Sequence, residues 1–315
     1  MSENVHDKKR LAELQALPLE RKIMITQTRI IEWYLKWKGQ VYVSFSGGKD
    51  STVVSRLVDM ALPKNKIPRV FINTGIEYNA IVKFVKELAE QDNRFVMLKP
   101  SKPIKETLEK YGYPFKSKAH AKKVHEYRTM HHLSPYIQRY LRGCNADGTH
   151  SCFKCPDVLQ YQFTEENTLN ISHLCCNKLK KEPAHKWAKE TGKSIVITGI
   201  RAEEGGARVQ VGCIIKKGDS IVKFHPLIKV NNEWENWFVE KEKIQLCELY
   251  YEPYNFERTG CKGCPFALNL QEQLETMEIY LPAERKQCEY IWKPVYEEYR
   301  RLGYRLKKNE QMKLL

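Results

Sequence analysis

The sequence predicts an α/β fold in which a parallel sheet carries helices on both faces. Between residues 41 and 98, short apolar runs of strand-like composition alternate with amphipathic stretches of helical period. A glycine-rich turn directly follows the first of these runs, and a basic stretch later interrupts the alternation. Together these observations indicate a βαβαβ series with right-handed crossovers, a basic helical insertion and a C-terminal helical extension.

Each predicted element rests on its local pattern of apolar residues. A helix over 19–37 is predicted because isoleucines and aromatic residues recur on one broad face. The strands predicted next are 41–45, 68–73 and 94–98, and the helices between them are 52–60 and 81–90. After the insertion come a helix near 184–190, a strand at 194–198, a hairpin of 213–215 with 221–224, a helix over 234–244, and long helices up to residue 301.

The length of 315 residues is enough for one large domain or two smaller ones. Because no repeat or low-complexity linker is evident, we expect one compact unit. It would consist of an N-terminal helical segment at 1–40, an α/β domain at 41–250 with its insertion at about 102–172, and C-terminal helices at 251–315 packed on the same unit.

The cysteine content and the N-terminus together predict a cytoplasmic protein with no membrane partner. Ten cysteines accompany a polar, charged segment at 1–10, and no apolar run is long enough to span a bilayer. Thiols in that compartment stay reduced, so clustered cysteines indicate metal binding or catalysis before disulfides.

The formal net charge of +15 implies an anionic partner. Residues 102–142 hold ten Lys or Arg against three Glu. Aromatic side chains are interleaved with these charges: Tyr111, Tyr113, Phe115, Tyr127, Tyr136 and Tyr140. Basic groups beside flat rings suit a nucleic-acid strand, but a solvated helical insertion with its aromatics in the core fits the pattern equally well.

The turn after the first strand, residues 46–51 with the sequence SGGKDS, has the pattern of a phosphate cradle. Two glycines let the backbone turn with several N–H groups aimed at one point, and the following helix presents its positive dipole end there. Lys49 adds a full charge, and Ser46 and Ser51 add hydroxyl groups. The spacing disfavours a Walker-type NTPase. An ordinary strand-to-helix turn rich in Gly and Ser is the alternative.

These six residues resemble the PP-loop of the ATP pyrophosphatases of the adenine nucleotide alpha hydrolase superfamily. The resemblance implies a Rossmann-like (HUP-type) sheet and cleavage of ATP, with Mg²⁺, into AMP and pyrophosphate. It implies catalytic roles for Lys49, which would stabilise the departing pyrophosphate, for Asp50, which would position Mg²⁺, and for Ser51. The nucleotide-binding residues it implies here are Ser44, Phe45, Ser46, Gly47, Gly48, Lys49, Asp50 and Ser51.

Two cysteine pairs, Cys175-Cys176 and Cys261-x-x-Cys264, can supply four thiolates. Four thiolates suit either tetrahedral zinc or an iron-sulfur cluster, and the spacing alone does not choose between them. Buried thiols without a metal are the remaining alternative. A third group, Cys144, Cys152 and Cys155, leaves more possibilities open: zinc binding with His150, cluster ligation, a persulfide carrier or a structural role.

A Cys-Cys pair joined by a later Cys-x-x-Cys resembles the phosphoadenosine phosphosulfate reductase family. The resemblance implies that Cys175, Cys176, Cys261 and Cys264 hold a 4Fe-4S cluster near the lysines at 178, 180 and 181. It also implies that two further segments contact the nucleotide: Asn73, Thr74 and Gly75 in one, and Gly199, Arg201 and Arg208 in the other. A surface ion pair with Glu203 or Glu204 is the alternative for Arg208.

Two departures from the reductases shape the functional expectation. The loop keeps the Lys-Asp-Ser of pyrophosphatases, and residues 306–315 contain no cysteine. We therefore expect an ATP pyrophosphatase that activates an acceptor, most plausibly nucleic acid, for sulfur transfer, with a cysteine desulfurase or a dithiol as donor. The alternatives are a sulfonucleotide reductase that uses a loop cysteine such as Cys152 or Cys155, and a nucleotide-binding module without turnover.

Overall fold

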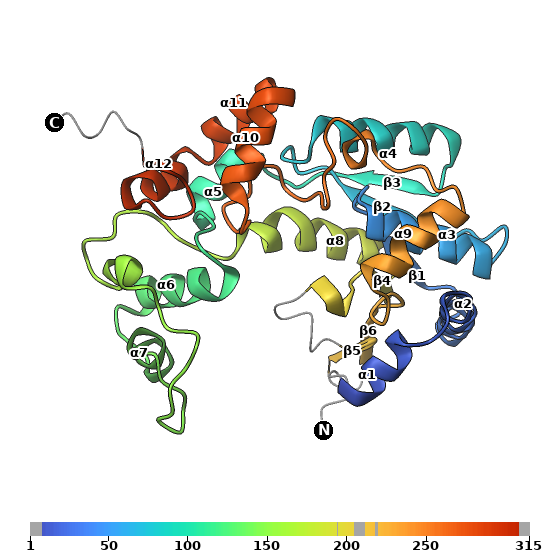
Figure 1. The fold of residues 1–315 in the computed structure, drawn as a ribbon, viewed down its shortest axis with the longest axis horizontal. Helices are drawn as coiled ribbons and strands as arrows, with labels where there is room; N and C mark the ends of the chain where they lie inside the picture. The colour runs from blue at the N-terminus through green and yellow to red at the C-terminus, as the bar shows by residue number, and fades with distance from the viewer. Residues whose placement is uncertain (1–7, 194, 205–211, 218–219, 309–315) are drawn as a thin grey trace. The chain divides into compact units, whose positions relative to one another are not determined.

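The computed structural model describes residues 8–193, 195–204, 212–217 and 220–308 (Figure 1). Contacts divide the chain into two compact units. The first comprises Met1–Asn73, Glu77–Lys99 and Pro183–Gly260, and the second comprises Thr74–Ile76, Pro100–Glu182 and Cys261–Leu315. The insertion and the C-terminal helices thus share one unit. The boundaries between the two units differ from the domain boundaries expected from the sequence.

The first unit is built on a six-stranded sheet of order β3-β2-β1-β4-β6-β5. Five strands run parallel, and β5 pairs antiparallel with β6. The strands are β1 Val41–Ser44, β2 Arg69–Ile72, β3 Phe95–Leu98, β4 Ile195–Ile197, β5 Ile214–Lys217 and β6 Ser220–Phe224. The helices are α1 Lys8–Gln15, α2 Leu19–Lys36, α3 Lys49–Ala61, α4 Asn79–Gln91, α8 Glu182–Thr191 and α9 Asn232–Lys241. The predicted α/β class with a parallel sheet is confirmed.

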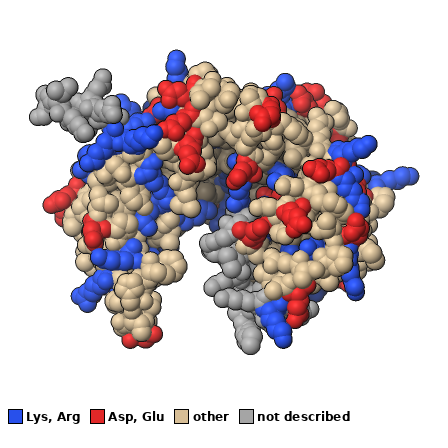
Figure 2. Space-filling model, in the orientation of Figure 1, with Lys and Arg blue, Asp and Glu red and all other residues tan. Residues whose placement is uncertain are grey.

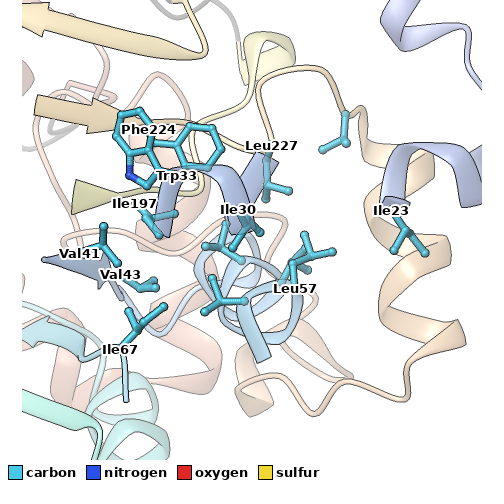
Figure 3. Packing of buried hydrophobic residues seen from close by; sticks show 14 of the residues in the cluster. Ile23, Ile30, Trp33, Val41, Val43, Leu57, Ile67, Ile197, Phe224 and Leu227 are labelled. Atoms are coloured by element: carbon cyan, nitrogen blue, oxygen red, sulfur yellow. The ribbon is translucent and has the colours of Figure 1, made fainter. Parts of the chain in front are cut away.

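Helices cover both faces of this sheet because its strands alternate their side chains. Val41 and Val43 point into a core shared with α2, α3 and α9, where Trp33 of α2 stacks on Phe224 at 4.8 Å between ring centroids (Figure 3). Tyr42, between those two valines, points to the opposite face and packs against Trp187 of α8. The apolar face of α2 therefore packs against the sheet, and this packing stabilises the helix.

The second unit is mainly helical. Its elements are α5 Ile104–Tyr111, α6 Lys118–Met130, α7 Pro135–Arg142, a 3₁₀ segment Asp157–Phe163, a π-helical segment Asn177–Lys181, α10 Leu270–Tyr280, α11 Pro282–Ile291 and α12 Lys293–Leu302. Ser117 and Ser134 cap α6 and α7 by accepting backbone N–H bonds. The expected long C-terminal helices are three shorter ones. Pro282 is the first residue of α11 and Pro294 the second residue of α12, because proline is accommodated in a first turn and not in a helix interior.

The aromatic residues of the insertion divide between core and surface. Phe115 is fully buried and packs on Tyr299 at 4.4 Å, and Tyr113 is also buried. Tyr136 is half exposed. The buried rings fit a helical insertion with its aromatic residues in the core, and the exposed ring of Tyr136 is available to a nucleic-acid strand. Across the described residues, no helix combines the length and apolar character needed to cross a membrane.

Candidate functional site

The predicted order of strand, glycine turn and helix is present around the loop after β1. Strand β1 ends at Ser44, Gly48 caps the helix and α3 begins at Lys49. Gly47 has φ +73°, and a Cβ there would lie 2.8 Å from Cγ2 of Ile81. A Cβ on Gly48 would lie 3.0 Å from Oγ1 of Thr259. Position 47 therefore needs glycine for its backbone conformation and for space, and a side chain at Gly48 would press tightly on Thr259.

The side chains of two predicted nucleotide-binding residues support the loop from within. The hydroxyl of Ser51 is buried, donates to the carbonyl of Gly48 at 2.8 Å and accepts the N–H of Ser46 at 3.1 Å. Phe45 is also buried and meets Phe95 edge-on at 5.0 Å. The side chains of Ser51 and Phe45 thus hold the loop in shape.

Side chains far along the sequence contact Lys49. Its backbone N–H donates to the hydroxyl of Tyr250 at 2.9 Å, and that hydroxyl lies 2.8 Å from Oγ1 of Thr259. Its ammonium donates to Oδ1 of Asn236 at 3.0 Å and lies 3.4 Å from Oε2 of Glu235. No motif in the sequence pointed to Tyr250, Thr259 or Asn236, because they are brought to the loop only by folding.

Gly199 and Arg201, to which the family resemblance gave a contact with the nucleotide, lie beside the loop. A Cβ on Gly199 would lie 2.8 Å from the carbonyl carbon and oxygen of Asp50, so only glycine allows β4 to end this close to α3. Nε of Arg201 lies 2.5 Å from Oδ1 of Asp50, and another guanidinium nitrogen lies 3.3 Å from Oε2 of Glu235. Arg208, predicted with them, lies outside the described residues.

Glu235 is fully buried and is the main site residue that the sequence analysis missed. Burial and the neighbouring carboxylate of Asp50 raise its pKa to about 7, and the charges of Arg201 and Lys49 limit the rise. A carboxylate within the aromatic-rich segment from Trp234 to Phe238 was a signal that could have identified it. Two carboxylates and two cations thus form one compact charge cluster, defined here as the loop cluster.

The segment after β2 is split between the two units. Asn73 ends the first unit's segment, and its N–H donates to the carbonyl of Leu98 at 2.8 Å. Thr74 is buried, and Gly75 has φ +84° and accepts a hydrogen bond from Nε2 of Gln287 at 3.3 Å. Contact of these three residues and Ser44 with a nucleotide stays a prediction.

The two cysteine pairs lie near one another in the second unit. The sulfurs of Cys175 and Cys176 are 4.0 Å apart. The hydrogen bond to Cys176 and burial raise the pKa of Cys175, and the negative charges of Cys264 and Cys261 raise it further. The pKa of Cys176 falls to about 5, chiefly because of the hydrogen bond from Cys175, with Lys118, Lys180 and Lys181 adding to the effect against desolvation.

Trp292, between α11 and α12, and Tyr296 of α12 hold the Cys261–Cys264 loop. The indole N–H of Trp292 donates to the carbonyl of Lys262 at 3.1 Å, and the hydroxyl of Tyr296 donates to that of Gly263. Among the described residues, no three His, Cys, Asp or Glu side chains are gathered as a metal site. The cluster therefore stays a proposal for these cysteines.

The third cysteine group is not assembled into one set of ligands. Cys144 and His150 form a backbone bridge, and Cys152 is exposed. Cys155 is fully buried, and burial raises the pKa of its thiol to about 11. Cys144 and Cys152, without Cys155, line a cavity of the second unit. The zinc alternative with His150 gains no support within the described part of the chain.

Sequence comparison identifies the family. The family model of the phosphoadenosine phosphosulfate reductase domain matches residues 40–151 and 149–267, which is more than half of the chain. The chain belongs to the phosphoadenosine phosphosulfate reductase family. This family member is also 26% identical, over 285 residues, to an uncharacterized protein of Methanocaldococcus jannaschii, and the match covers 89% of the chain and 54% of the relative. The chain thus spans about half the length of the curated relative it matches.

Solved structures show weaker similarity to this family member. A phosphoadenylyl-sulfate reductase of Candida auris has a TM-score of 0.45 at 16% identity and covers 81% of this chain and 96% of its own. An FMN adenylyltransferase of Candida glabrata has 0.42 at 15%, with coverage of 76% and 64%. The U34-tRNA thiolase NcsA of Methanococcus maripaludis, with its 4Fe-4S cluster, has 0.35 at 14%, with coverage of 88% and 80%. Similarity at this level does not bear on the chemistry of the site.

Proposed function

We propose that the protein is an ATP pyrophosphatase that adenylylates an acceptor for sulfur transfer. The observation that carries the proposal is the loop cluster. Lys49 of an SGGKDS loop and Arg201 after β4 lie together with Asp50 and Glu235. The site lies at the carboxyl ends of adjacent parallel strands, where open α/β sheets bind their ligands. Membership of a family whose name refers to an adenine nucleotide supports the same choice.

The chemistry assigned to these residues is displacement at the α-phosphorus of ATP. An acceptor oxygen bonds to that phosphorus, the bond to the bridging oxygen breaks, and pyrophosphate leaves with the electron pair. The ammonium of Lys49 would exchange Asn236 and Glu235 for a phosphate oxygen and stabilise the departing charge. The guanidinium of Arg201 can bind a phosphate through two N–H groups.

The carboxylates of Asp50 and Glu235 fit a magnesium ion, because Mg²⁺ prefers carboxylate and phosphate oxygens. Both carboxylates now pair with Arg201. If Mg²⁺ and a triphosphate entered together, the two carboxylates would pair with Mg²⁺ and Arg201 would pair with a phosphate. A magnesium ion held there would supply further positive charge for the phosphates. The role of the two side chains is to hold it in position.

Cys175, Cys176, Cys261 and Cys264 are proposed to hold a 4Fe-4S cluster. Four cysteines at two loops are the required donor set, and the hydrogen bond from Cys175 favours the thiolate form of Cys176. The nearby lysines offset the negative charge of such a site. When bound, the cluster would supply sulfur-handling or electron-transfer chemistry.

The acceptor and the sulfur donor complete the proposal. The acceptor is nucleic acid, as the basic aromatic insertion suggests, and sulfur arrives as a persulfide from a cysteine desulfurase. The outer sulfur of the persulfide bonds to the activated carbon of the acceptor while the carbon–oxygen bond breaks and AMP leaves. A dithiol then reduces the remaining sulfur–sulfur bond, which frees the thiolated acceptor and the carrier thiol.

Pyrophosphate and AMP release by anaerobically purified protein tests the proposal. Lys49→Ala should lower the rate by about 10²-fold or more, because it removes the charge facing the leaving group. Lys83→Ala, which changes an exposed lysine of α4, is the matched control and should keep the rate of the natural protein. An unchanged rate in Lys49→Ala, with circular dichroism showing a folded protein, would remove the loop from the mechanism.

Sulfonucleotide reduction is the second candidate, favoured by the family and by the exposed thiol of Cys152. The thiolate would attack the sulfur of the activated sulfate and release the nucleotide, and an external dithiol would then free sulfite. Sulfite from activated sulfate and dithiol, without pyrophosphate from ATP, would select this candidate over the first.

A further inference from the structure

A cavity of about 490 Å³ lies within the second unit, beside α6, α7 and the loop of residues 144–154. Figure 2 shows that Lys and Arg side chains are spread over the visible surface and do not form one continuous patch. Surface charge alone therefore does not locate an anion site in this basic protein. The cavity does, because its lining contains four basic residues, Lys116, Lys123, Arg139 and Lys154, and no Asp or Glu.

Three of these cations lack a counter-charge. No salt bridge among the described residues pairs Lys116, Lys123 or Arg139 with a carboxylate, whereas Lys154 pairs with Asp157 at 2.9 Å. His120 adds no charge, because burial lowers its pKa to about 4 against the opposing effect of its hydrogen bond with Gln162 at 2.6 Å. The cavity is therefore a positively charged recess without an internal anion.

Lys123 is the most deeply buried cation of this cavity. Only 6% of its surface is exposed, and its ammonium lies over the rings of Tyr136 and Tyr140, at 4.3 and 4.5 Å from their centroids. Cation–π contacts compensate only part of the cost of burying a charge. An entering anion would supply the rest. Lys116 is fixed close by, since its backbone N–H donates to the hydroxyl of Tyr299 at 2.7 Å.

Exposed aromatic rings also line the cavity. Tyr136 is 50% exposed and Phe153 is 79% exposed, and neither position is explained by packing into the core. A flat ring beside a cationic recess suits a ligand that has both a negative charge and a planar apolar face. The volume lies within the range of pockets that hold one ligand of nucleotide size.

We propose that this cavity binds one nucleotide, with its phosphate held by Lys116, Lys123 and Arg139 and its base stacked on Tyr136 or Phe153. A single-stranded nucleic acid and a free mononucleotide both present this chemistry. The proposal deepens the proposed function by giving the acceptor a binding site, and it rests on that function only for the identity of the acceptor. Its binding chemistry depends on the cavity alone.

The test is fluorescence anisotropy of labelled single-stranded RNA and DNA oligonucleotides with the whole protein, without ATP or its analogues, because a saturating nucleotide would itself compete for the cavity. Arg139→Gln should weaken binding several-fold and reduce the slope of log K against log salt by about 1. Tyr136→Ala should weaken binding roughly tenfold and leave that slope unchanged. Arg142→Gln, which changes an exposed arginine at the end of the same helix, and Tyr290→Ala, an exposed tyrosine of α11, are the matched controls.

An unlabelled 5′-mononucleotide as competitor separates the two sources. Displacement only by an unlabelled strand assigns the cavity to nucleic acid, and displacement by the mononucleotide assigns it to a free nucleotide. Equal losses in the cavity variants and their controls, or no binding of either ligand, would overturn the proposal. Oligonucleotide binding without pyrophosphate release would contradict the proposed function alone, and pyrophosphate release without cavity-dependent binding would contradict only this inference.

Discussion

Lys49 and Arg201 share the carboxylate of Glu235, and Arg201 also pairs with Asp50. When Glu235 is ionised, the two carboxylates of the loop cluster balance its two cations before any ligand enters. A nucleotide triphosphate with a divalent cation can therefore bind by exchanging ion pairs, without leaving a buried charge uncompensated.

The pH dependence of stability tests this arrangement at Glu235. Its pKa is about 7 in the folded protein against an ordinary value of 4.5, so the folded state favours the protonated carboxyl. Its contribution to stability is therefore lost as pH rises between these values. Because glutamine cannot ionise, Glu235→Gln should gain stability relative to the natural protein over this interval, by up to about 3 kcal/mol.

Urea unfolding at about pH 5 and about pH 8 measures this difference. Glu233→Gln removes an exposed carboxyl from the same helix and should follow the natural protein at both pH values. A constant difference between Glu235→Gln and the natural protein across the interval would contradict the raised pKa.

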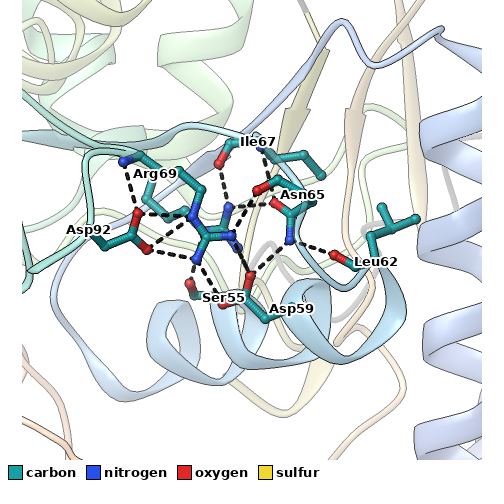
Figure 4. A network of polar contacts seen from close by, with 8 residues as sticks. Ser55, Asp59, Leu62, Asn65, Ile67, Arg69 and Asp92 are labelled. Carbon is teal, nitrogen blue, oxygen red and sulfur yellow. Dashed lines mark hydrogen bonds and ion pairs between the residues drawn. The ribbon is translucent and has the colours of Figure 1, made fainter.

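At the scale of elements, a polar network ties α3 to β2 and the turn before β3 (Figure 4). Arg69, the first residue of β2, is fully buried and pairs with Asp59 of α3 at 2.6 Å. Arg94 pairs with the same carboxylate at 2.7 Å and with Asp92 at 2.7 Å. The network fixes the helix after the phosphate loop against the strand beside β1, and so supports the position of the loop.

Asp59→Ala is expected to cost about 3–5 kcal/mol of unfolding free energy, because it leaves the guanidinium of Arg69 buried without its counter-charge. Glu87→Ala removes an exposed partner of Lys83 at 3.9 Å and should cost less than about 1 kcal/mol. Chemical denaturation of both variants measures the contrast, and similar small losses would show that Arg69 does not depend on Asp59.

The elements themselves were largely predictable from the sequence. The strands at 41–45 and 94–98 and the helix at 19–37 appear with nearly the same bounds, because their apolar periodicity is continuous. The C-terminal helices were predicted too long. Their apolar pattern continues across Leu281 and Trp292, where one helix ends and the next one carries a proline in its first turn.

At the scale of the whole molecule, two units divide the chemistry. The loop cluster belongs to the first unit, and the two cysteine pairs with the basic cavity belong to the second. Each unit combines segments that are distant in sequence. The boundaries expected from composition did not anticipate this, because a helical insertion and a helical terminus carry no local mark that they share a core.

Metal analysis tests the chemistry assigned to the second unit. Protein purified without oxygen should be brown and contain about four iron atoms per chain. Cys264→Ser should lose most of this iron and the visible absorption. Cys247→Ser, which changes a buried thiol of the first unit, should keep both. One zinc and no iron in the natural protein would replace the cluster with a tetrahedral zinc site.

The sequence by itself determined the fold class, the order of strands and helices, and the phosphate-loop pattern, because periodicity and motif spacing are local properties of a chain. Only the tertiary structure decided what surrounds Lys49. Tyr250 lies 201 positions away in the sequence and Asn236 lies 187 positions away, and buried Glu235 acquires its pKa from neighbours that folding supplies. The environment of a charge depends on distance in space, and no pattern along the chain encodes that distance.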